Sequence, residues 1–338
     1  MIKNDILEKC TDKKIKNPKF VNFISSLTSK NNLNLMKECG DFLIFLADNK
    51  LENKKLEKGN FCKNRFCPMC SWRKSLKDAL EISILMEHLR LEECKEFIFL
   101  TLTTPNVDGN DLEKEIKKYN DSFKKLLKRK EVLPIVKGYI RKLEVTYAKD
   151  QFITKELYEK KKEYYNLRML KEGDVEPNYN TYNPHFHVVI AVDKSYFKNK
   201  HYITKEKWLE LWKDVTGNAS ITQIDIQKAT LKNNKHMYEL AKYSAKDSDY
   251  LYSKEVFKVF YNALKGKQVL VFGGLFKDAH KMYENGELDI YKEKNTIEYT
   301  YRLYYNWCKT NYENTRLVEL TLEEKKKINN RLVDEIEI

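Results

Sequence analysis

The chain has 338 residues, of which 42% are hydrophobic and 33% are charged, as is typical of a folded globular protein. No apolar run approaches the roughly 20 residues that span a bilayer, and residues 1–19 lack the apolar core of a signal peptide, so we expect a cytoplasmic protein with no membrane partner. In that compartment the seven cysteines are poor candidates for structural disulfides. The net charge of +13 favours an anionic partner such as nucleic acid, although lysine-rich sequences also arise from genomic bias.

The first 60 residues carry few chemical signals. Cys10 stands alone in a charged segment and is interpreted as a free thiol. Apolar residues at helical spacing predict a helix across 20–27, and the apolar run 42–46 follows Cys39-Gly40. A polar connection rich in Lys and Asn then leads to residue 60.

A cysteine cluster follows this connection. Cys67 and Cys70 are two residues apart, and such a pair can hold one tetrahedral metal ion from a tight turn, which Pro68 favours. Cys62 as a third ligand and Cys39 as a fourth predict a structural zinc site. Because Cys39 and Cys62 do not form a close pair, a buried thiol cluster or a redox pair is the alternative.

The segment that carries this cluster is strongly basic. It has no acidic residue between positions 62 and 77, and a rigid basic turn suits contact with phosphates. A solvated surface is the alternative interpretation. The candidate DNA-binding residues are Lys63, Arg65, Arg73, Lys74 and Lys77.

The middle of the chain alternates predicted helices and strands without the glycine-rich loops of nucleotide-binding folds. We therefore expect an α+β fold with a central antiparallel sheet flanked by helices. A charged excursion at 150–182, with helical character, interrupts this domain. The sequence predicts helices at 72–92, 112–131 and 204–215, and strands at 97–104, 138–147, 183–192 and 221–227.

Two histidines begin the most apolar of these strands. The period of two along a strand places His185 and His187 on the same face. Neighbouring imidazoles suit a divalent metal, but two hydrogen-bonded histidines at a sheet end would look the same. If strand 138–147 pairs with this one, Glu144 completes a site of two histidines and one carboxylate.

A predicted helix across 231–249 carries the last chemical signal. Glu239 and Tyr243 are four residues apart and share a face, with Lys246 one turn further. The alternative is an ordinary exposed face, because the chain has 22 tyrosines. Residues 254–338 start with a helix and a strand at 269–272, followed by two charged helical stretches, and indicate accessory binding or oligomerisation.

Taken in order, the cysteine cluster, Arg141-x-Leu-Glu144, Asn183-Pro-His185-Phe-His187 and Glu239-x-x-x-Tyr243 resemble the motifs of one family. This family comprises the rolling-circle replication initiators of small plasmids from Gram-positive bacteria, a branch of the HUH (His-hydrophobic-His) endonucleases. The resemblance runs from about Cys39 to Phe276. The insertion at 150–182 departs from most members, as does Asn183, where many have a further histidine.

The resemblance implies a metal-dependent DNA nicking and joining enzyme. His185, His187 and Glu144 would hold Mn²⁺ or Mg²⁺ on the scissile phosphate. Tyr243 would attack that phosphate, leaving a 5′-phosphotyrosine and a free 3′-OH primer. Glu239 would activate water for termination, and Lys246 would contact a phosphate. Tyr238 lies on another face of the same predicted helix, and Tyr250 has no glutamate four residues earlier, so Tyr243 is preferred.

The expected partners are origin DNA, as a single strand or hairpin, and by resemblance the host helicase and polymerase. A second copy of the chain, in a homo-oligomer, is a further candidate partner. We expect three regions: 1–95 with the zinc knuckle, 96–253 as the nuclease domain, and 254–338 as an accessory region. The alternatives are an HUH transposase or relaxase with the same chemistry, and a non-catalytic DNA-binding regulator stapled by zinc.

Overall fold

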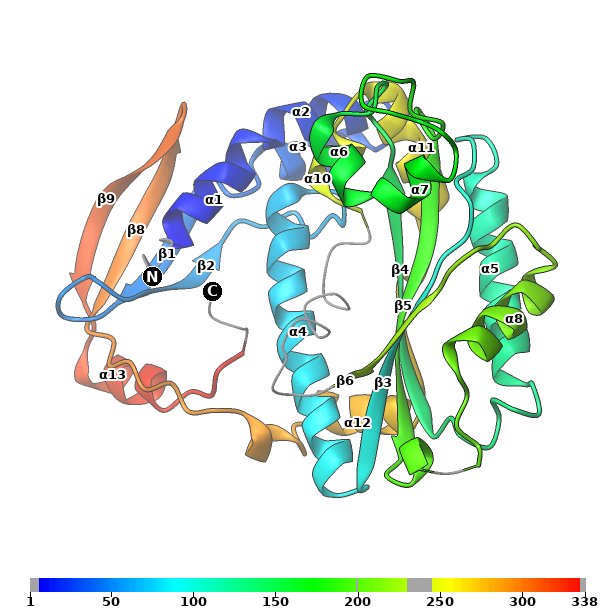
Figure 1. The fold of residues 1–338 in the computed structure, drawn as a ribbon. Helices are drawn as coiled ribbons and strands as arrows, with labels where there is room; N and C mark the ends of the chain where they lie inside the picture. Colours follow the sequence, from blue (N-terminus) through cyan, green and yellow to red (C-terminus); the bar gives the residue numbers. More distant parts are fainter. Residues whose placement is uncertain (1–5, 199, 230–244, 335–338) are drawn as a thin grey trace. The chain divides into compact units, whose positions relative to one another are not determined.

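The structure is a computed structural model that describes residues 6–198, 200–229 and 245–334. The chain divides into two compact units, which are described separately. The central unit contains residues 94–229 and 245–276, and the flanking unit contains residues 6–93 and 277–334. Each unit has its own antiparallel sheet and its own helices (Figure 1), which confirms the predicted α+β class.

The central unit is built on a five-stranded antiparallel sheet with the strand order β6-β3-β5-β4-β7. Its strands are β3 (Lys95–Leu102), β4 (Gly138–Tyr147), β5 (Tyr182–Asp193), β6 (Asp225–Ala229) and β7 (Leu270–Gly274). Its helices are α5 (Leu112–Leu127), α6 (Lys155–Lys160), α7 (Lys162–Asn166), α8 (Lys205–Thr216), α10 (Asp247–Tyr250) and α11 (Lys254–Leu264), with a 3₁₀ turn η1 (Tyr196–Lys198).

Strand β5 occupies the middle of this sheet because it is apolar on both faces over residues 188–192, which are all buried. It pairs with β3 on one side and β4 on the other, and the register places Glu144 opposite His185. Strands β6 and β7 form the edges, and β6 is largely exposed.

Helices α5 and α8 lie side by side on one face of the sheet (Figure 1). Phe123 of α5 packs edge-on against Phe186 of β5, and Tyr119 packs against Trp212 of α8. Phe123, Phe186 and Trp212 are fully buried, and each such side chain contributes roughly 1.5–3 kcal/mol. This burial fixes the apolar face of β5 toward the helices, so His185 and His187 must face the other side.

The local signals of α8 agree with its prediction from sequence. The Thr204 hydroxyl accepts a hydrogen bond from the Lys207 backbone N–H, and Gly217 ends the helix with φ +62°. The insertion at 150–182 is helical, as expected, through α6 and α7. Its interior is held by the buried Glu176, which accepts a hydrogen bond from the Tyr165 hydroxyl.

The flanking unit draws its four-stranded sheet from both ends of the described chain, in the order β2-β1-β8-β9. Its strands are β1 (Phe42–Ala47), β2 (Lys54–Gly59), β8 (Tyr301–Cys308) and β9 (Asn311–Glu319). Its helices are α1 (Ile6–Ile15), α2 (Asn17–Ile24), α3 (Lys30–Lys37), α4 (Pro68–Leu91) and α13 (Leu322–Asn329), with a 3₁₀ turn η2 (Asp289–Tyr291); α12 (Leu275–Glu284) begins at the boundary of the two units.

One prediction for the flanking unit is wrong, and another is incomplete. The segment before residue 60 contains strand β2 in place of a polar connection, because Leu56 is buried where β2 pairs with β1. The two charged helical stretches expected after Phe276 correspond to α12 and α13, but the β-hairpin of β8 and β9 at 301–319, which lies between them in the sequence, was not predicted. No described helix is long and apolar enough to cross a membrane.

Candidate metal centres

The central unit brings Glu144, His185 and His187 together on the polar face of its sheet. One ligand atom from each lies within 4.8 Å of the others. Glu144 Oε2 is 3.1 Å from His187 Nε2 and 3.6 Å from His185 Nε2. Both Nε2 atoms therefore approach the same carboxylate oxygen, and the two imidazole rings are nearly perpendicular, with centroids 4.9 Å apart. We call these three residues the Glu-His-His group.

Hydrogen bonds at the far side of each imidazole favour metal binding by Nε2. His185 Nδ1 is 3.2 Å from the carbonyl oxygen of Asn183, and a carbonyl can only accept, so the Nδ1–H form is favoured. His187 Nδ1 is 3.3 Å from the Thr101 hydroxyl. With the proton on Nδ1, the Nε2 lone pair of each ring is available to a cation, as in many histidine metal sites.

Glu144 is ready to act as an anionic ligand. Its side chain is buried, with 5% of its surface exposed, and burial alone would raise its pKa. Before a cation binds, hydrogen bonds donated by the Nε2–H groups of His185 and His187, together with electrostatic attraction to the two rings, outweigh burial and hold the pKa of Glu144 well below its usual range. A bound cation would take the place of the two Nε2 protons. Two imidazoles and a carboxylate suit Mn²⁺ and Mg²⁺, with Mn²⁺ the better match to nitrogen ligands.

The flanking unit brings Cys39, Cys62, Cys67 and Cys70 together, with their sulfur atoms within 4.8 Å of one another. Three of the Sγ–Sγ distances are 3.5, 3.5 and 3.7 Å. Four sulfurs around zinc at about 2.3 Å are spaced by roughly 3.8 Å, so this cluster has the size of a tetrahedral zinc site.

Two backbone N–H groups point at the sulfurs and help fix the cluster. Cys62 N–H donates to Cys39 Sγ at 3.4 Å, and Lys63 N–H donates to Cys70 Sγ at 3.2 Å. Lys63 has φ +58°, a conformation that is uncommon without glycine and that turns its N–H toward the cluster. Hydrogen bonds from the three neighbouring thiols lower the pKa of Cys70, whereas hydrogen bonds within the cluster raise the pKa of Cys39 and of Cys67. The cluster therefore favours a thiolate at Cys70, and a bound zinc ion would displace the protons of the other thiols.

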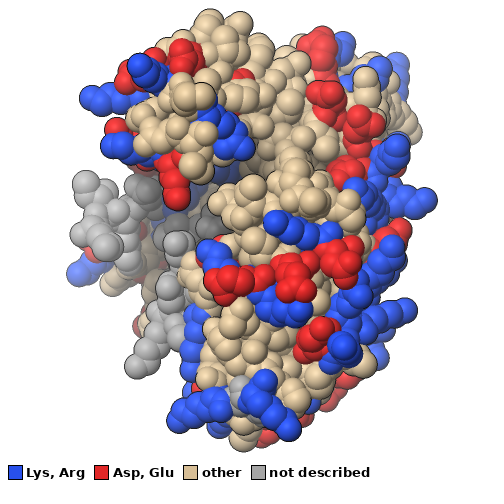
Figure 2. Space-filling view, turned by 45° about the vertical axis from the view of Figure 1, so that its right-hand side comes forward, with Lys and Arg blue, Asp and Glu red and all other residues tan. Residues whose placement is uncertain are grey.

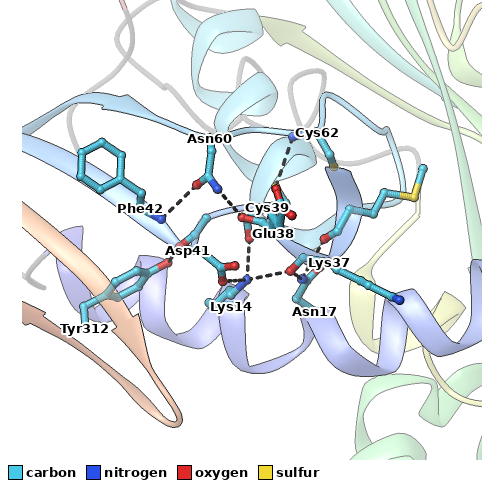
Figure 3. A network of polar contacts seen from close by, with 12 residues as sticks. Lys14, Asn17, Lys37, Glu38, Cys39, Asp41, Phe42, Asn60, Cys62 and Tyr312 are labelled. Atoms are coloured by element: carbon cyan, nitrogen blue, oxygen red, sulfur yellow. Dashed lines mark hydrogen bonds and ion pairs between the residues drawn. The ribbon is translucent and has the colours of Figure 1, made fainter. Parts of the chain in front are cut away.

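A buried polar network holds the loop that presents Cys39 (Figure 3). Lys14 of α1 is 4% exposed, and its ammonium donates to the carbonyl oxygens of Cys39 at 2.8 Å and of Lys37 at 3.2 Å. The same nitrogen lies 2.6 Å from the Asp41 carboxylate. From strand β9 the Tyr312 hydroxyl donates to the carbonyl oxygen of Gly40 at 2.6 Å. Helix α1 and strand β9 therefore position the loop between them.

The five basic residues predicted for DNA contact differ in their surroundings. Lys74 forms an ion pair with Asp78 at 2.8 Å, and the Arg73 guanidinium lies 4.1 Å from the centroid of the Phe61 ring. Lys63, Arg65 and Lys77 have exposed side chains. Figure 2 shows basic and acidic side chains mixed on the face that it presents, so the net charge alone does not locate a nucleic-acid surface.

The tyrosine motif is only partly covered by the described structure. Glu239 and Tyr243, like the rival Tyr238, lie outside the described residues. Lys246 is exposed and precedes α10. The rival Tyr250 is 2% exposed in α10, a position that leaves its hydroxyl little access to a DNA strand.

Sequence reasoning missed Thr101, which contacts His187 from the neighbouring strand. The available signal was a strand that turns from apolar to hydroxyl-bearing residues at Thr101, Thr103 and Thr104. It also missed Lys205, Gln223 and Asp225, which line a pocket beside the two histidines.

Comparisons with known proteins place the chain in a family. The model of the family described as "Replication protein" matches residues 53–314. A "Protein rep" from Staphylococcus aureus is 51% identical over 249 residues, which is 73% of this chain and 96% of the relative. A "Protein rep" from Bacillus amyloliquefaciens is 30% identical over 279 residues, 75% of this chain and 74% of the relative. A "Protein rep" from Streptococcus pneumoniae serotype 2 is 32% identical over 267 residues, which is again 75% of this chain and 74% of the relative.

The chain therefore belongs to the replication protein family. This membership confirms the resemblance to the replication initiators that the sequence motifs indicate. No solved structure matches this one.

Proposed function

We propose that this protein initiates rolling-circle replication of a plasmid by nicking and rejoining one strand of its origin DNA. The observation that carries the proposal is the Glu-His-His group, three convergent ligands on the polar face of the sheet in a replication protein. Such a set gives a cation the protein ligands it needs while leaving further positions for phosphate oxygens.

Glu144, His185 and His187 would hold Mn²⁺ or Mg²⁺, which polarises a scissile phosphate when bound. Tyr243 is the proposed nucleophile. Its phenol oxygen forms a bond to phosphorus, the bond from phosphorus to the 3′ oxygen breaks, and that oxygen gains a proton to become the 3′-OH primer. A phenol with a pKa near ~10 is mostly neutral at pH 7, so its proton must be taken up as it attacks.

Termination is assigned to Glu239. Its carboxylate would accept a proton from water as the water oxygen forms a bond to phosphorus. The bond from phosphorus to the 3′ oxygen breaks, and that oxygen gains a proton, so that the reaction ends in hydrolysis. Lys246 would contact a DNA phosphate, and zinc in the cysteine cluster would stabilise the flanking unit. A single-stranded or hairpin origin is the proposed substrate, with the host helicase and polymerase as partners by resemblance.

A denaturing gel with a labelled origin oligonucleotide and Mn²⁺ tests the proposal. The wild-type chain should form a covalent adduct that Tyr243→Phe abolishes, while the matched control Tyr250→Phe retains it. An adduct that persists in Tyr243→Phe would contradict the assignment of the nucleophile. In Glu239→Ala, nicking should survive while release of the attached protein fails.

The same gel weighs the other two functions. A wild-type chain that binds origin DNA but never forms an adduct would support a non-catalytic regulator stapled by the cysteine cluster. A relaxase or transposase would form the same adduct at a different DNA site, so sequencing the nick in the resident replicon separates it from an initiator.

A further inference from the structure

A pocket of about 410 Å³ lies beside the histidine pair on the polar face of the central sheet. Its volume falls within the range of small-molecule sites, roughly 300–1,000 Å³, and is large enough for one nucleotide. The residues of its lining that matter here are His185, His187, Thr101, Lys205, Gln223 and Asp225.

The strand register explains why these side chains share one face. Thr101 of β3 pairs with His187 on one side and with Asp225 of β6 on the other. Directly paired residues of antiparallel strands point to the same side of a sheet, so the three side chains form a row. Asp225 stands two strand spacings from His187, about 10 Å.

The two ends of this row suit different parts of a nucleotide. The Glu-His-His group and a bound cation would attract a phosphate, whereas the Asp225 carboxylate repels one. A carboxylate can only accept hydrogen bonds. Its Oδ2 accepts from Gln227 Nε2 at 2.7 Å, and its Oδ1 has no hydrogen-bond partner among the described residues. The Asp225 end therefore fits a base that carries hydrogen-bond donors.

Two further lining residues complete this division. Lys205 is exposed in the first turn of α8, where its ammonium is available to a backbone phosphate. Gln223 carries an amide that both donates and accepts hydrogen bonds, and it lies two residues before Asp225. The pocket thus combines a cationic side chain with neutral and anionic groups that suit a base edge.

We propose that this pocket takes one nucleotide of single-stranded DNA beside the scissile phosphate, and that Asp225 selects its base. Guanine offers an imino and an amino donor side by side to a carboxylate. Adenine and cytosine offer one amino group, and thymine offers an imino group between two carbonyls that the carboxylate repels. Guanine is therefore expected to bind best and thymine worst. This inference rests on the proposed function, because the nick defines the phosphate beside the pocket.

The test uses the full-length protein, Mn²⁺ and a synthetic single-stranded DNA library with a randomised segment. Strands that bind and strands that become covalently attached are sequenced separately. The wild-type chain should enrich guanine and deplete thymine at one position, which in the attached strands adjoins the nick. Asp225→Asn should weaken that preference roughly tenfold at this position alone, since loss of a good base contact has about this effect.

Two matched variants separate base selection from charge. Asp121→Asn makes the same change at an exposed position of α5 and should leave every preference intact. Lys205→Ala should weaken binding to all sequences, lower the salt dependence by about one phosphate contact and leave the base preference unchanged.

Each outcome has a distinct meaning. Strand β6 is a sheet edge, where charged residues commonly serve only to prevent aggregation; a base preference unchanged in Asp225→Asn would support that role and overturn the subsite. Bound strands with the expected preference but no attached strands would overturn the proposed nicking function while leaving the subsite in place. Attached strands with no base preference beside the nick would support the proposed nicking function and overturn the subsite.

Discussion

Four sulfur atoms converge in the flanking unit, whereas the central unit offers two imidazole nitrogens and one carboxylate oxygen. The cysteine cluster supplies a full set of four soft ligands, and backbone N–H groups and a buried lysine surround it. The Glu-His-His group supplies three ligands and borders a pocket. A complete tetrahedral set leaves no position for substrate, whereas an incomplete set beside a pocket does. Ligand number and surroundings therefore support the structural role proposed for the cysteine cluster and the catalytic role proposed for the Glu-His-His group.

The largest effect is expected from His187→Ala, which removes one ligand of the incomplete set. Loss of an outer-shell partner typically weakens a metal site 10- to 100-fold, and loss of a ligand should exceed that. Mn²⁺ binding by calorimetry and adduct formation on a gel should both fall below detection. His201→Ala, an exposed histidine of the same unit, should change neither. Normal adduct formation in His187→Ala would contradict a catalytic role for the Glu-His-His group.

Cys67→Ser should lower the stability of the flanking unit and should not act on the nicking reaction directly. Structural zinc can supply roughly 10–16 kcal/mol of apparent binding energy, so its loss should unfold part of the flanking unit. Metal analysis of the native protein should find about one zinc per chain, and the variant should have much less. Cys308→Ser changes an exposed thiol of the same unit and should keep the zinc. A native protein without zinc would refute the structural assignment.

Thr101→Val tests whether metal binding by the Glu-His-His group depends on the residue that contacts His187 from the neighbouring strand. Valine has nearly the same shape but lacks the hydroxyl that lies 3.3 Å from His187 Nδ1, which would accept from Nδ1–H when Nε2 binds a cation. Mn²⁺ affinity, measured by titration, should drop roughly 10- to 100-fold. Thr103→Val is the matched control, because Thr103 lines the same pocket and its hydroxyl contacts Asn183 and Thr104. Equal affinities in the two variants would show that Thr101 does not orient the imidazole.

Lys14→Met should have the smallest effect, because it touches the cysteine cluster only through the backbone. Buried carbonyl oxygens at Cys39 and Lys37 would lose their donor, at about 1–3 kcal/mol of stability. Zinc release to a coloured chelator should be several-fold faster, and the melting temperature should fall by a few degrees. Lys30→Met, on the exposed start of α3, should match the wild type. An unchanged rate of zinc release would show that Lys14 contributes to packing and not to zinc retention.

Much of the central unit could be predicted from sequence because its signals are local. The apolar run of β5 and the cap and glycine of α8 lie within a few residues of the structure that they specify. The sequence could place Glu144 beside the histidines only on the condition that the two strands pair. Cross-strand pairing joins segments some 40 residues apart, and no local sequence pattern determines which strands pair. The structure meets that condition by placing Glu144 opposite His185.

The hairpin of β8 and β9 was not predicted because its local sequence signals are weak. Strand β9 is exposed along most of its length, so it shows little of the apolar alternation that identifies a half-buried strand. Its turn uses Lys309 at φ +57° where a glycine or asparagine would have signalled a hairpin. The pairing with β1, far away in sequence, supplies the stability that the local sequence lacks.

The bond from Tyr312 to Gly40 also bears on how the chain is made. These residues are 272 positions apart, and at about 5–20 residues per second a ribosome needs roughly 14–54 seconds to add the second after the first. During that interval the Cys39 loop has neither Tyr312 nor the β8–β9 hairpin, while the strands of the central unit are being synthesised. Nascent chains should therefore acquire zinc late, and a pulse-labelled chain should become resistant to thiol modification only after its last strands are synthesised.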